Sequence, residues 1–255
     1  MPAHAADVDV PGGSFPAPLS AKALLKRWLP RTVTERLRFT HWRLKKHRYS
    51  FEGEDTLADF LLRARIGNRV GCYVDVGANH PIHNSNTYWF YKRGWCGVCI
   101  DPTPGFAGAY ARSRPRDMFV ESGVGADAEL EFHTFEESQY NTFSKDLADR
   151  HRASGEPYAF ATTVPVRPLM ALLAEQAVSP ESIDLFNLDV EGHELAVLSG
   201  IDWHRFRPAV VIAEVFATSL PDLLRDPVNL HLEQAGYVAA SKLHNSAIYI
   251  RRADD

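Results

Sequence analysis

The chain has 255 residues, of which 45% are apolar and 24% charged, and these values are typical of a globular protein with a sizeable core. The net charge of −4 excludes binding to nucleic acid through overall charge, so no nucleic-acid partner is expected. The charge is uneven: residues 1–48 carry 10 basic and 3 acidic residues, and residues 49–255 carry 18 and 29. We therefore expect two parts, a disordered start with a basic helical arm (1–48) and an acidic globular body (49–255).

The first part also bears on localisation. Asp7 and Asp9 stand where a signal peptide would carry positive charge, and no apolar run is long enough to span a bilayer. The sequence predicts a cytoplasmic protein. Residues 21–48 are compatible with a basic amphipathic helix that contacts the inner membrane surface or an acidic protein, and equally with a helix packed on the body. The sequence does not indicate an oligomeric state.

From residue 70 onward, short β-branched segments alternate with segments of helical periodicity. Strands are expected at 70–76, 97–100, 118–121, 130–135, 183–190, 209–215, 237–240 and 247–251. Helices are expected at 84–92, 106–112, 168–177, 194–198 and 220–235. This alternation is typical of a doubly wound, mostly parallel α/β sheet of Rossmann-like type.

The pattern is weak between Asp127 and Thr163. Long insertions in α/β enzymes often form substrate lids, but they can also be plain surface excursions. Both interpretations are open at this point.

The most informative motif is C-Y-V-D-V-G-A-N, residues 72–79. Gly77 follows an apolar strand, where a glycine permits a tight turn and close approach of a ligand. Asp101 ends the next predicted strand, roughly 20 residues after the turn, where an acid can accept hydrogen bonds from both ribose hydroxyls. The spacing therefore predicts a site for a nucleoside cofactor.

The turn itself narrows the choice of cofactor. A dinucleotide site needs two further glycines to hold a pyrophosphate, and the turn G-A-N-H-P-I-H lacks them. S-adenosylmethionine has no phosphate, so one glycine suffices. Its charged methionine part needs polar partners, and the residues near the turn that could supply them are Asp75, Asn79, Asn84, Ser85, Asn86 and Thr87.

Three segments resemble the FkbM family of S-adenosylmethionine-dependent methyltransferases. They are V-D-V-G-A-N (74–79), G-W-C-G-V-C-I-D-P-T-P (94–104) and D-L-F-N-L-D-V-E-G-H-E-L-A-V-L-S-G (184–200). The resemblance covers roughly residues 70–250. It implies a seven-stranded class I methyltransferase sheet within a methyltransferase domain at 49–255. Residues 80–87 depart from the glycine-rich tail that many family members have after the first motif.

The resemblance also implies roles for individual residues. Asp75, Gly77 and Asn79 would contact the amino-acid part of the cofactor, Asp101 its ribose, and Asp189 would face the sulfonium. Pro102 would shape the adenine slot, with Glu121, Ser122 and Gly123 flanking the adenine. The full set of expected cofactor-binding residues is Asp75, Gly77, Ala78, Asn79, Asn86, Thr87, Asp101, Pro102, Glu121, Ser122, Gly123 and Asp189.

Family resemblance further implies methylation of oxygen on a small-molecule or glycan acceptor, such as a sugar, a glycoconjugate or a natural product. A hydroxyl has a high pKa, so a base or a metal must help remove its proton. The candidate catalytic residues are Asp189, Glu191, His193 and His83. Each also has a structural interpretation: orienting the cofactor, charging a helix start, capping, or lying idle in a loop.

A divalent metal held by Asp189, Glu191 and His193 is possible but not favoured, because no second cluster of ligands accompanies them. No metal ligands are therefore assigned. Two other functions stay open. One is a nicotinamide-dependent oxidoreductase on the same type of fold, against which the missing glycines count. The other is a non-catalytic adaptor that uses the basic arm, against which the intact cofactor motifs count.

Overall fold

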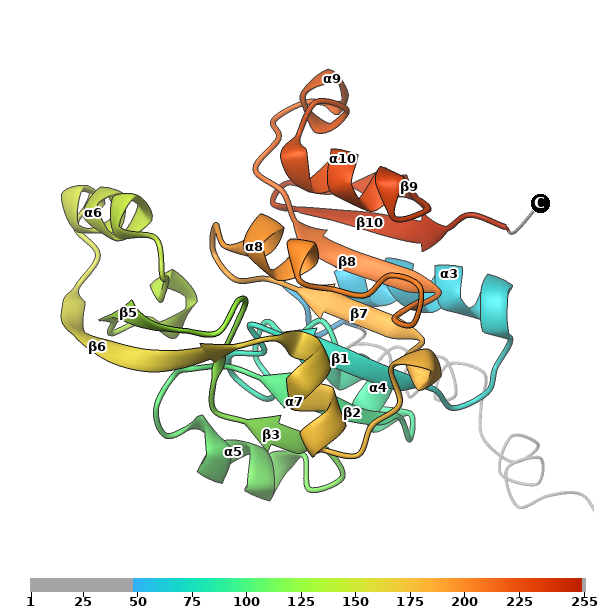
Figure 1. The fold of residues 1–255 in the computed structure, drawn as a ribbon, viewed down its shortest axis with the longest axis horizontal. Helices are drawn as coiled ribbons and strands as arrows, with labels where there is room; N and C mark the ends of the chain where they lie inside the picture. Colours follow the sequence, from blue (N-terminus) through green and yellow to red (C-terminus); the bar gives the residue numbers. More distant parts are fainter. Residues whose placement is uncertain (1–47, 254–255) are drawn as a thin grey trace, which may run out of the picture. The chain divides into compact units, whose positions relative to one another are not determined.

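The computed structural model describes residues 48–253 and shows a seven-stranded sheet in the order β3-β2-β1-β7-β8-β10-β9 (Figure 1). The strands are β1 (Cys72–Val76), β2 (Cys96–Ile100), β3 (Met118–Val120), β7 (Leu185–Leu188), β8 (Val210–Glu214), β9 (Tyr237–Lys242) and β10 (Ser246–Arg251). The pairs from β3 to β8 are parallel, and β10 is antiparallel to both neighbours. The predicted doubly wound, mostly parallel seven-stranded sheet is confirmed.

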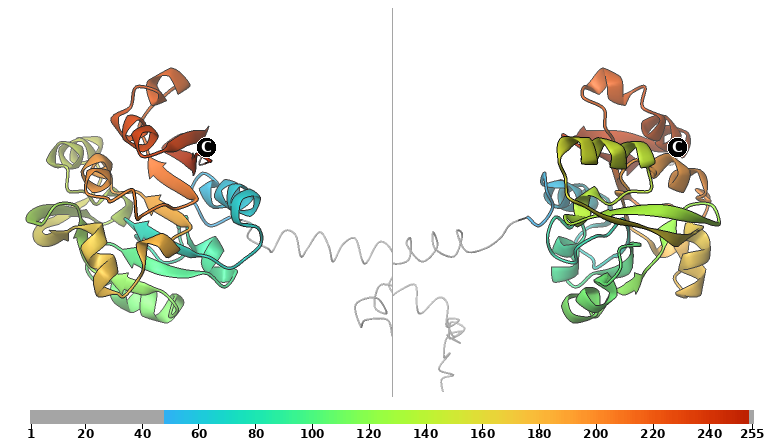
Figure 2. Two further views of the ribbon diagram at one scale, coloured as in Figure 1. Left: turned by 45° about the vertical axis from the view of Figure 1, so that its right-hand side comes forward. Right: turned by 90° about the vertical axis from the view of Figure 1, so that its left-hand side faces the viewer.

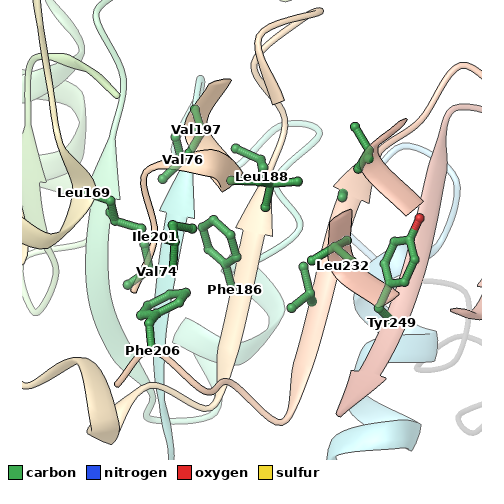
Figure 3. Packing of buried hydrophobic residues seen from close by; sticks show 14 of the residues in the cluster. Val74, Val76, Leu169, Phe186, Leu188, Val197, Ile201, Phe206, Leu232 and Tyr249 are labelled. Atoms are coloured by element: carbon green, nitrogen blue, oxygen red, sulfur yellow. The ribbon is translucent and has the colours of Figure 1, made fainter. Parts of the chain in front are cut away.

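Helices cover both faces of this sheet. They are α3 (Glu54–Ile66), α4 (Tyr88–Lys92), α5 (Phe106–Ser113), α7 (Leu169–Glu175), α8 (Glu194–Ser199), α9 (Leu220–Leu223) and α10 (Pro227–Gln234). One apolar core joins β1, β7 and β8 to α7, α8 and α10, with Val74, Phe186 and Leu232 fully buried (Figure 3). A second core packs α3, α4 and α5 on the opposite face. The molecule therefore has the three layers of a doubly wound fold.

The alternation of side chains along β1 divides its residues between the two faces. Val74 and Val76 enter the first core, and Tyr73 enters the second. Asp75 shares the parity of Tyr73, because successive side chains of a strand point to opposite faces. In the register of the sheet Asp75 is paired with Asn187 on β7. A carboxylate and an amide thus lie side by side near the carboxyl end of the sheet.

An insertion between β3 and α7 forms a separate three-stranded sheet in the order β4-β6-β5. Its elements are β4 (Gly123–Val124), β5 (Ala128–Phe135), the 3-10 helix η1 (Ser138–Tyr140), α6 (Lys145–Ser154) and β6 (Tyr158–Arg167). Figure 2 shows α6 lying over the long β5–β6 pair at one end of the fold. The expected strand at 130–135 is confirmed, but its partner β6 and the helix α6 were not predicted.

Two predicted helices differ from those observed. The helix expected at 84–92 begins only at Tyr88, because Asn84 has a left-handed backbone (φ 54°) and Ser85 Oγ accepts the Tyr88 N–H. The helix expected at 220–235 is divided into α9 and α10. Asp226 ends the connection and caps α10 by accepting the Val228 N–H at 2.8 Å, and Pro227 takes the first helical position.

The basic arm expected at 1–48 lies outside the described residues apart from Arg48, so its role stays a prediction. The first described residues are hydrogen-bonded to the globular body. Tyr49 and Ser50 donate their main-chain N–H groups to Asp55, which is fully buried at the start of α3. Within residues 48–253, no helix has the length and apolar character needed to cross a membrane.

Candidate active site

A cavity of about 670 Å³ opens beyond the carboxyl ends of β1, β2, β7 and β8. This volume lies in the range of roughly 300–1,000 Å³ typical of small-molecule sites, and the position is where open α/β sheets bind ligands. The lining includes, from β1 and the loop after it, Asp75, Gly77, Ala78, Asn79, His83 and Asn86; after β2, Asp101, Pro102 and Thr103; after β7, Asp189, Val190 and Glu191; and, at the end of β8 and just after it, Glu214 and Phe216.

The turn after β1 is held against two neighbouring strands. Gly77 has a left-handed backbone (φ 74°), and its N–H and that of Ala78 donate to the Ile100 carbonyl of β2. A Cβ atom on Gly77 would lie 1.5 Å from the main-chain oxygen of Asp189. Only glycine fits both the backbone angle and this close approach, as the motif predicts.

Asp101 fastens the same turn from the end of β2. Its carboxylate accepts N–H groups from Asn79 and Thr103, both at 2.8 Å. Burial raises the pKa of Asp101, and the bonds from Thr103 and Asn79 oppose that rise. Each carboxylate oxygen keeps a further lone pair. Asp101 can therefore hold the loop and still accept ribose hydroxyls on the cavity side.

Asp75 is 1% exposed and has its own polar partners. Asn187 donates to it at 2.8 Å, the Thr87 hydroxyl donates to its other oxygen, and Asn86 donates to Asn187 at 2.8 Å. Burial raises the pKa of Asp75, and the positive charge of Arg114 opposes this rise. Through this chain of hydrogen bonds, Asp75 organises the loop after β1 as well as lining the cavity.

Arg114 lies beneath that loop with no exposed surface. It forms an ion pair with the equally buried Asp117 (2.5 Å) and donates to Tyr73 Oη, Thr87 Oγ1 (both 2.9 Å) and Ser85 Oγ (3.2 Å). No sequence pattern singled it out, because Asp117 is its one neighbour in sequence and the hydroxyl partners are 27 to 41 residues away along the chain. It is a structural cation under the site.

The opposite side of the cavity is strongly acidic. Burial, with the charges of Glu194 and Glu54, raises the pKa of Asp189 to about 7. Burial and the neighbouring Asp189 raise the pKa of Glu191 to about 9. Glu214 is 8% exposed, and burial raises its pKa as well. Glu214 was not among the site residues expected from the sequence.

The insertion closes one wall of the cavity through side-chain hydrogen bonds to the loops that follow three different strands. Ser138 Oγ donates to Asn79 Oδ1 (2.7 Å), Asn141 Nδ2 to Thr103 Oγ1 (3.1 Å), and Thr142 Oγ1 to the Glu191 carbonyl (2.8 Å). The cavity lining includes Phe132, Glu137, Ser138, Gln139, Tyr140, Asn141, Phe143 and His151 from this insertion. Of the two interpretations of this segment, its position favours the lid.

Most of the predicted site residues are thus brought together, but five do not line the cavity: Thr87, Glu121, Ser122, Gly123 and His193. Thr87 is buried behind Asp75. Glu121 is exposed, and Ser122 donates to the carbonyls of Gly123 and Pro165 in the insertion sheet. The adenine-flanking role of residues 121–123 is therefore not supported by their position.

The two candidate histidines differ. His193 is the N-cap of α8, as expected, but its ring packs on Phe143 and against Gly125, outside the cavity. Burial lowers its pKa. His83 does line the cavity, and its ring packs beside His80 at a centroid distance of 4.8 Å.

This arrangement is typical of a Rossmann-like enzyme with a nucleoside cofactor: one glycine turn, an acid after the second strand, and a cluster of acids after the strands beyond β1. The chain belongs to the FkbM methyltransferase family, because the methyltransferase FkbM domain matches residues 75–238. It is therefore an S-adenosylmethionine-dependent methyltransferase. The nicotinamide alternative is not supported by this membership.

Solved structures of similar fold include three bacterial methyltransferases. The 1,6-didemethyltoxoflavin-N1-methyltransferase of Burkholderia thailandensis, solved with bound 1,6-didemethyltoxoflavin and S-adenosylhomocysteine, is 14% identical over 92% of this chain and 91% of its own (TM-score 0.39). A Geobacter sulfurreducens methyltransferase is 15% identical over 90% and 95% (TM-score 0.41). An O-methyltransferase of Bacillus cereus is 14% identical over 91% and 96% (TM-score 0.38). No curated protein sequence matches the chain.

Proposed function

We propose that this methyltransferase transfers the methyl group of S-adenosylmethionine to a hydroxyl oxygen of a sugar, a glycoconjugate or a natural product. The observation that carries the proposal is that one cavity joins the glycine turn and Asp101 on one side to three carboxylates, Asp189, Glu191 and Glu214, on the other. A hydroxyl acceptor needs a proton acceptor beside it, whereas a neutral amine can attack without one.

The residues of the cofactor side fit S-adenosylmethionine. Gly77 leaves the space that a side chain would occupy, and Asp101 and Pro102 line the cavity beyond it. The turn has no glycines to cradle a phosphate, and this cofactor has none. When bound, S-adenosylmethionine supplies a methyl group on a positively charged sulfonium. The acidic lining favours a cation on electrostatic grounds.

The chain's own residues orient the reactants and move one proton. The acceptor oxygen forms a bond to the methyl carbon as the carbon–sulfur bond breaks, and the bonding pair stays on sulfur to give S-adenosylhomocysteine. The acceptor proton passes to a carboxylate of the acidic side. The insertion excludes water from this step through its contacts with Asn79 and Thr103.

Two aromatic side chains support a ring-shaped acceptor. Phe51 and Phe216 line the cavity yet remain 64% and 56% exposed. Exposed aromatic surface at a cavity is typical of a binding site, where a sugar or another ring can pack against it. The acceptor is therefore expected to combine such a ring with a hydroxyl group.

The test is incubation of the purified chain with isotopically labelled S-adenosylmethionine and pools of glycans and natural products, followed by mass spectrometry. The proposal predicts label on an oxygen of a ring-containing product, together with S-adenosylhomocysteine in equal amount. Asp189→Asn is the matched variant, expected to bind the cofactor but to lose most of the transfer. Label found only on nitrogen, or no label with any pool when cofactor binding is intact, would contradict the oxygen assignment.

A further inference from the structure

Three carboxylates converge on one point of the cavity. Asp189 follows β7, Glu191 lies in the left-handed turn after it (φ 51°), and Glu214 is the last residue of β8. One oxygen of each lies within 4.8 Å of the others. Because β7 and β8 are adjacent and parallel, their carboxyl ends bring residues 25 positions apart to the same point.

The most buried member of this cluster has one oxygen without a partner, although its carboxyl group also shares a hydrogen bond with Glu194. Glu214 is 8% exposed, and its Oε2 atom is buried without a hydrogen bond. A buried carboxylate oxygen without a donor is costly, so natural proteins usually supply one or bind a cation there. The unpartnered atom belongs to the residue whose carboxylate faces Asp189 and Glu191.

No basic side chain of the described part of the chain neutralises the cluster. None of the three carboxylates forms an ion pair with a Lys, Arg or His within residues 48–253. Lys242 is close enough to act on Glu214 through charge, but its ammonium donates to the carbonyls of Leu243 and His244. The attractive partner that this arrangement lacks is a positive charge.

We propose that Asp189, Glu191 and Glu214 bind one divalent cation, Mg²⁺ or Mn²⁺, in the cavity. Three carboxylates are hard oxygen ligands of the kind these ions prefer. The set differs from the one the sequence suggested, because Glu214 takes the place of His193, whose ring packs on Phe143 outside the cavity. The sequence did not favour a metal, because no second cluster of ligands accompanies Asp189, Glu191 and His193.

Glu194 is a positioning residue for this site. Its carboxylate accepts the N–H groups of Val190 (3.1 Å) and Gly192 (3.2 Å), which flank Glu191. These bonds fix the turn that presents Glu191 to Asp189. Glu194→Gln should therefore weaken binding of the cation, but by less than the removal of one of its three ligands does.

The catalytic role of the cation rests on the proposed function, whereas the binding of the cation to the three carboxylates does not. A divalent cation beside the acceptor hydroxyl stabilises the ionised oxygen and removes the need for a strong base. It also screens the three carboxylates from one another. Methyl transfer to oxygen would then depend on the ion.

The binding test uses the full chain, stripped with a chelator and titrated with Mn²⁺ in the absence of cofactor and acceptor. Electron paramagnetic resonance measures the free ion. One saturable site is expected, with a dissociation constant of about 1 mM or tighter. Glu214→Gln and Glu191→Gln should each weaken it by at least about 10-fold. Glu137→Gln, which removes a carboxylate from the same cavity but not from the cluster, should leave it unchanged.

Binding of S-adenosylhomocysteine, measured by calorimetry, shows whether each variant is folded. If Glu214→Gln does not fold, two other measurements test the site. One is Mn²⁺ binding by Glu191→Gln, and the other is displacement of Mn²⁺ from the wild-type chain by Mg²⁺. The proposal is overturned if the wild-type chain has no saturable Mn²⁺ site, or if folded ligand variants bind as it does. A Mn²⁺ site without oxygen methylation would refute the proposed function alone, and oxygen methylation by a chain that binds no ion would refute the site alone.

Discussion

The Cα atom of Gly77 packs directly on the main-chain carbonyl of Asp189. A Cβ atom at residue 77 would lie 1.5 Å from that oxygen, and Asp189 donates its own N–H to Val76 at 3.0 Å. The cofactor turn after β1 and the acidic turn after β7 are thus joined main chain to main chain. This contact fixes the spacing between the two turns.

Gly77→Ala should therefore damage both stability and cofactor binding. A left-handed backbone at a non-glycine residue costs roughly 1–2 kcal/mol, and the clash with Asp189 adds about 1–3 kcal/mol more. The matched control is Gly236→Ala, which has a similar backbone angle (φ 90°) but no atom near its Cβ position. Urea unfolding and calorimetry with S-adenosylhomocysteine measure the two effects. Equal losses in both variants would show that the contact does not shape the site.

Asp101→Asn should weaken the cofactor more than it weakens the fold. The amide keeps the shape of the side chain but loses one charged acceptor, and such hydrogen bonds contribute roughly 1.5–3 kcal/mol, or about 10–100-fold in affinity. Calorimetry with S-adenosylhomocysteine and a parallel melting curve separate the two. Asp127→Asn, an exposed aspartate, serves as the control. If the variant binds S-adenosylhomocysteine as tightly as the wild-type chain but melts at a lower temperature, Asp101 has only a structural role through its bonds to Asn79 and Thr103.

Arg114→Met should destabilise the fold by about 3–5 kcal/mol, because it leaves Asp117 and Asp75 buried without their cation. Arg112→Met, an exposed arginine in the last turn of α5, which Arg114 follows, should change stability by no more than about 0.5 kcal/mol. The measurement is the free energy of unfolding in urea. Adding Asp117→Asn to the Arg114 variant should recover part of the loss. A similar stability in the two single variants would mean that the buried ion pair contributes nothing.

Local patterns predicted the parts of the fold and site that depend on neighbouring residues. The apolar strand before Gly77, the turn itself and Asp101 lie within one β-strand, helix, β-strand unit, so spacing was enough to place them. Glu214 and Arg114 were missed because the cluster around Glu214, and the Tyr73 and Thr87 hydroxyls around Arg114, are brought near only by strand order and helix packing. His193 was misplaced for a related reason: its place in the motif gives no information on Phe143, the residue against which its ring packs.

The insertion was the least predictable element. Strand β6 is largely exposed, with Phe160 52% accessible, so its pattern lacks the apolar face that marks a core strand. Its function depends on a few polar contacts, such as Ser138 to Asn79, which no periodicity reveals. Such contacts can be recognised only once the two segments are seen together.

Ser138→Ala tests whether those contacts couple the insertion to the cofactor side. The substitution removes the 2.7 Å hydrogen bond to Asn79, whose contribution is about 1 kcal/mol, or roughly fivefold in affinity for S-adenosylhomocysteine. Ser182→Ala, which removes an exposed bond to the Ser179 carbonyl, is the control and should bind normally. Hydrogen exchange gives a second measurement. S-adenosylhomocysteine should slow exchange across residues 136–143 in the wild-type chain and less in the Ser138 variant, while α10 is unaffected. If the ligand leaves exchange in the insertion unchanged, this wall does not respond to the cofactor.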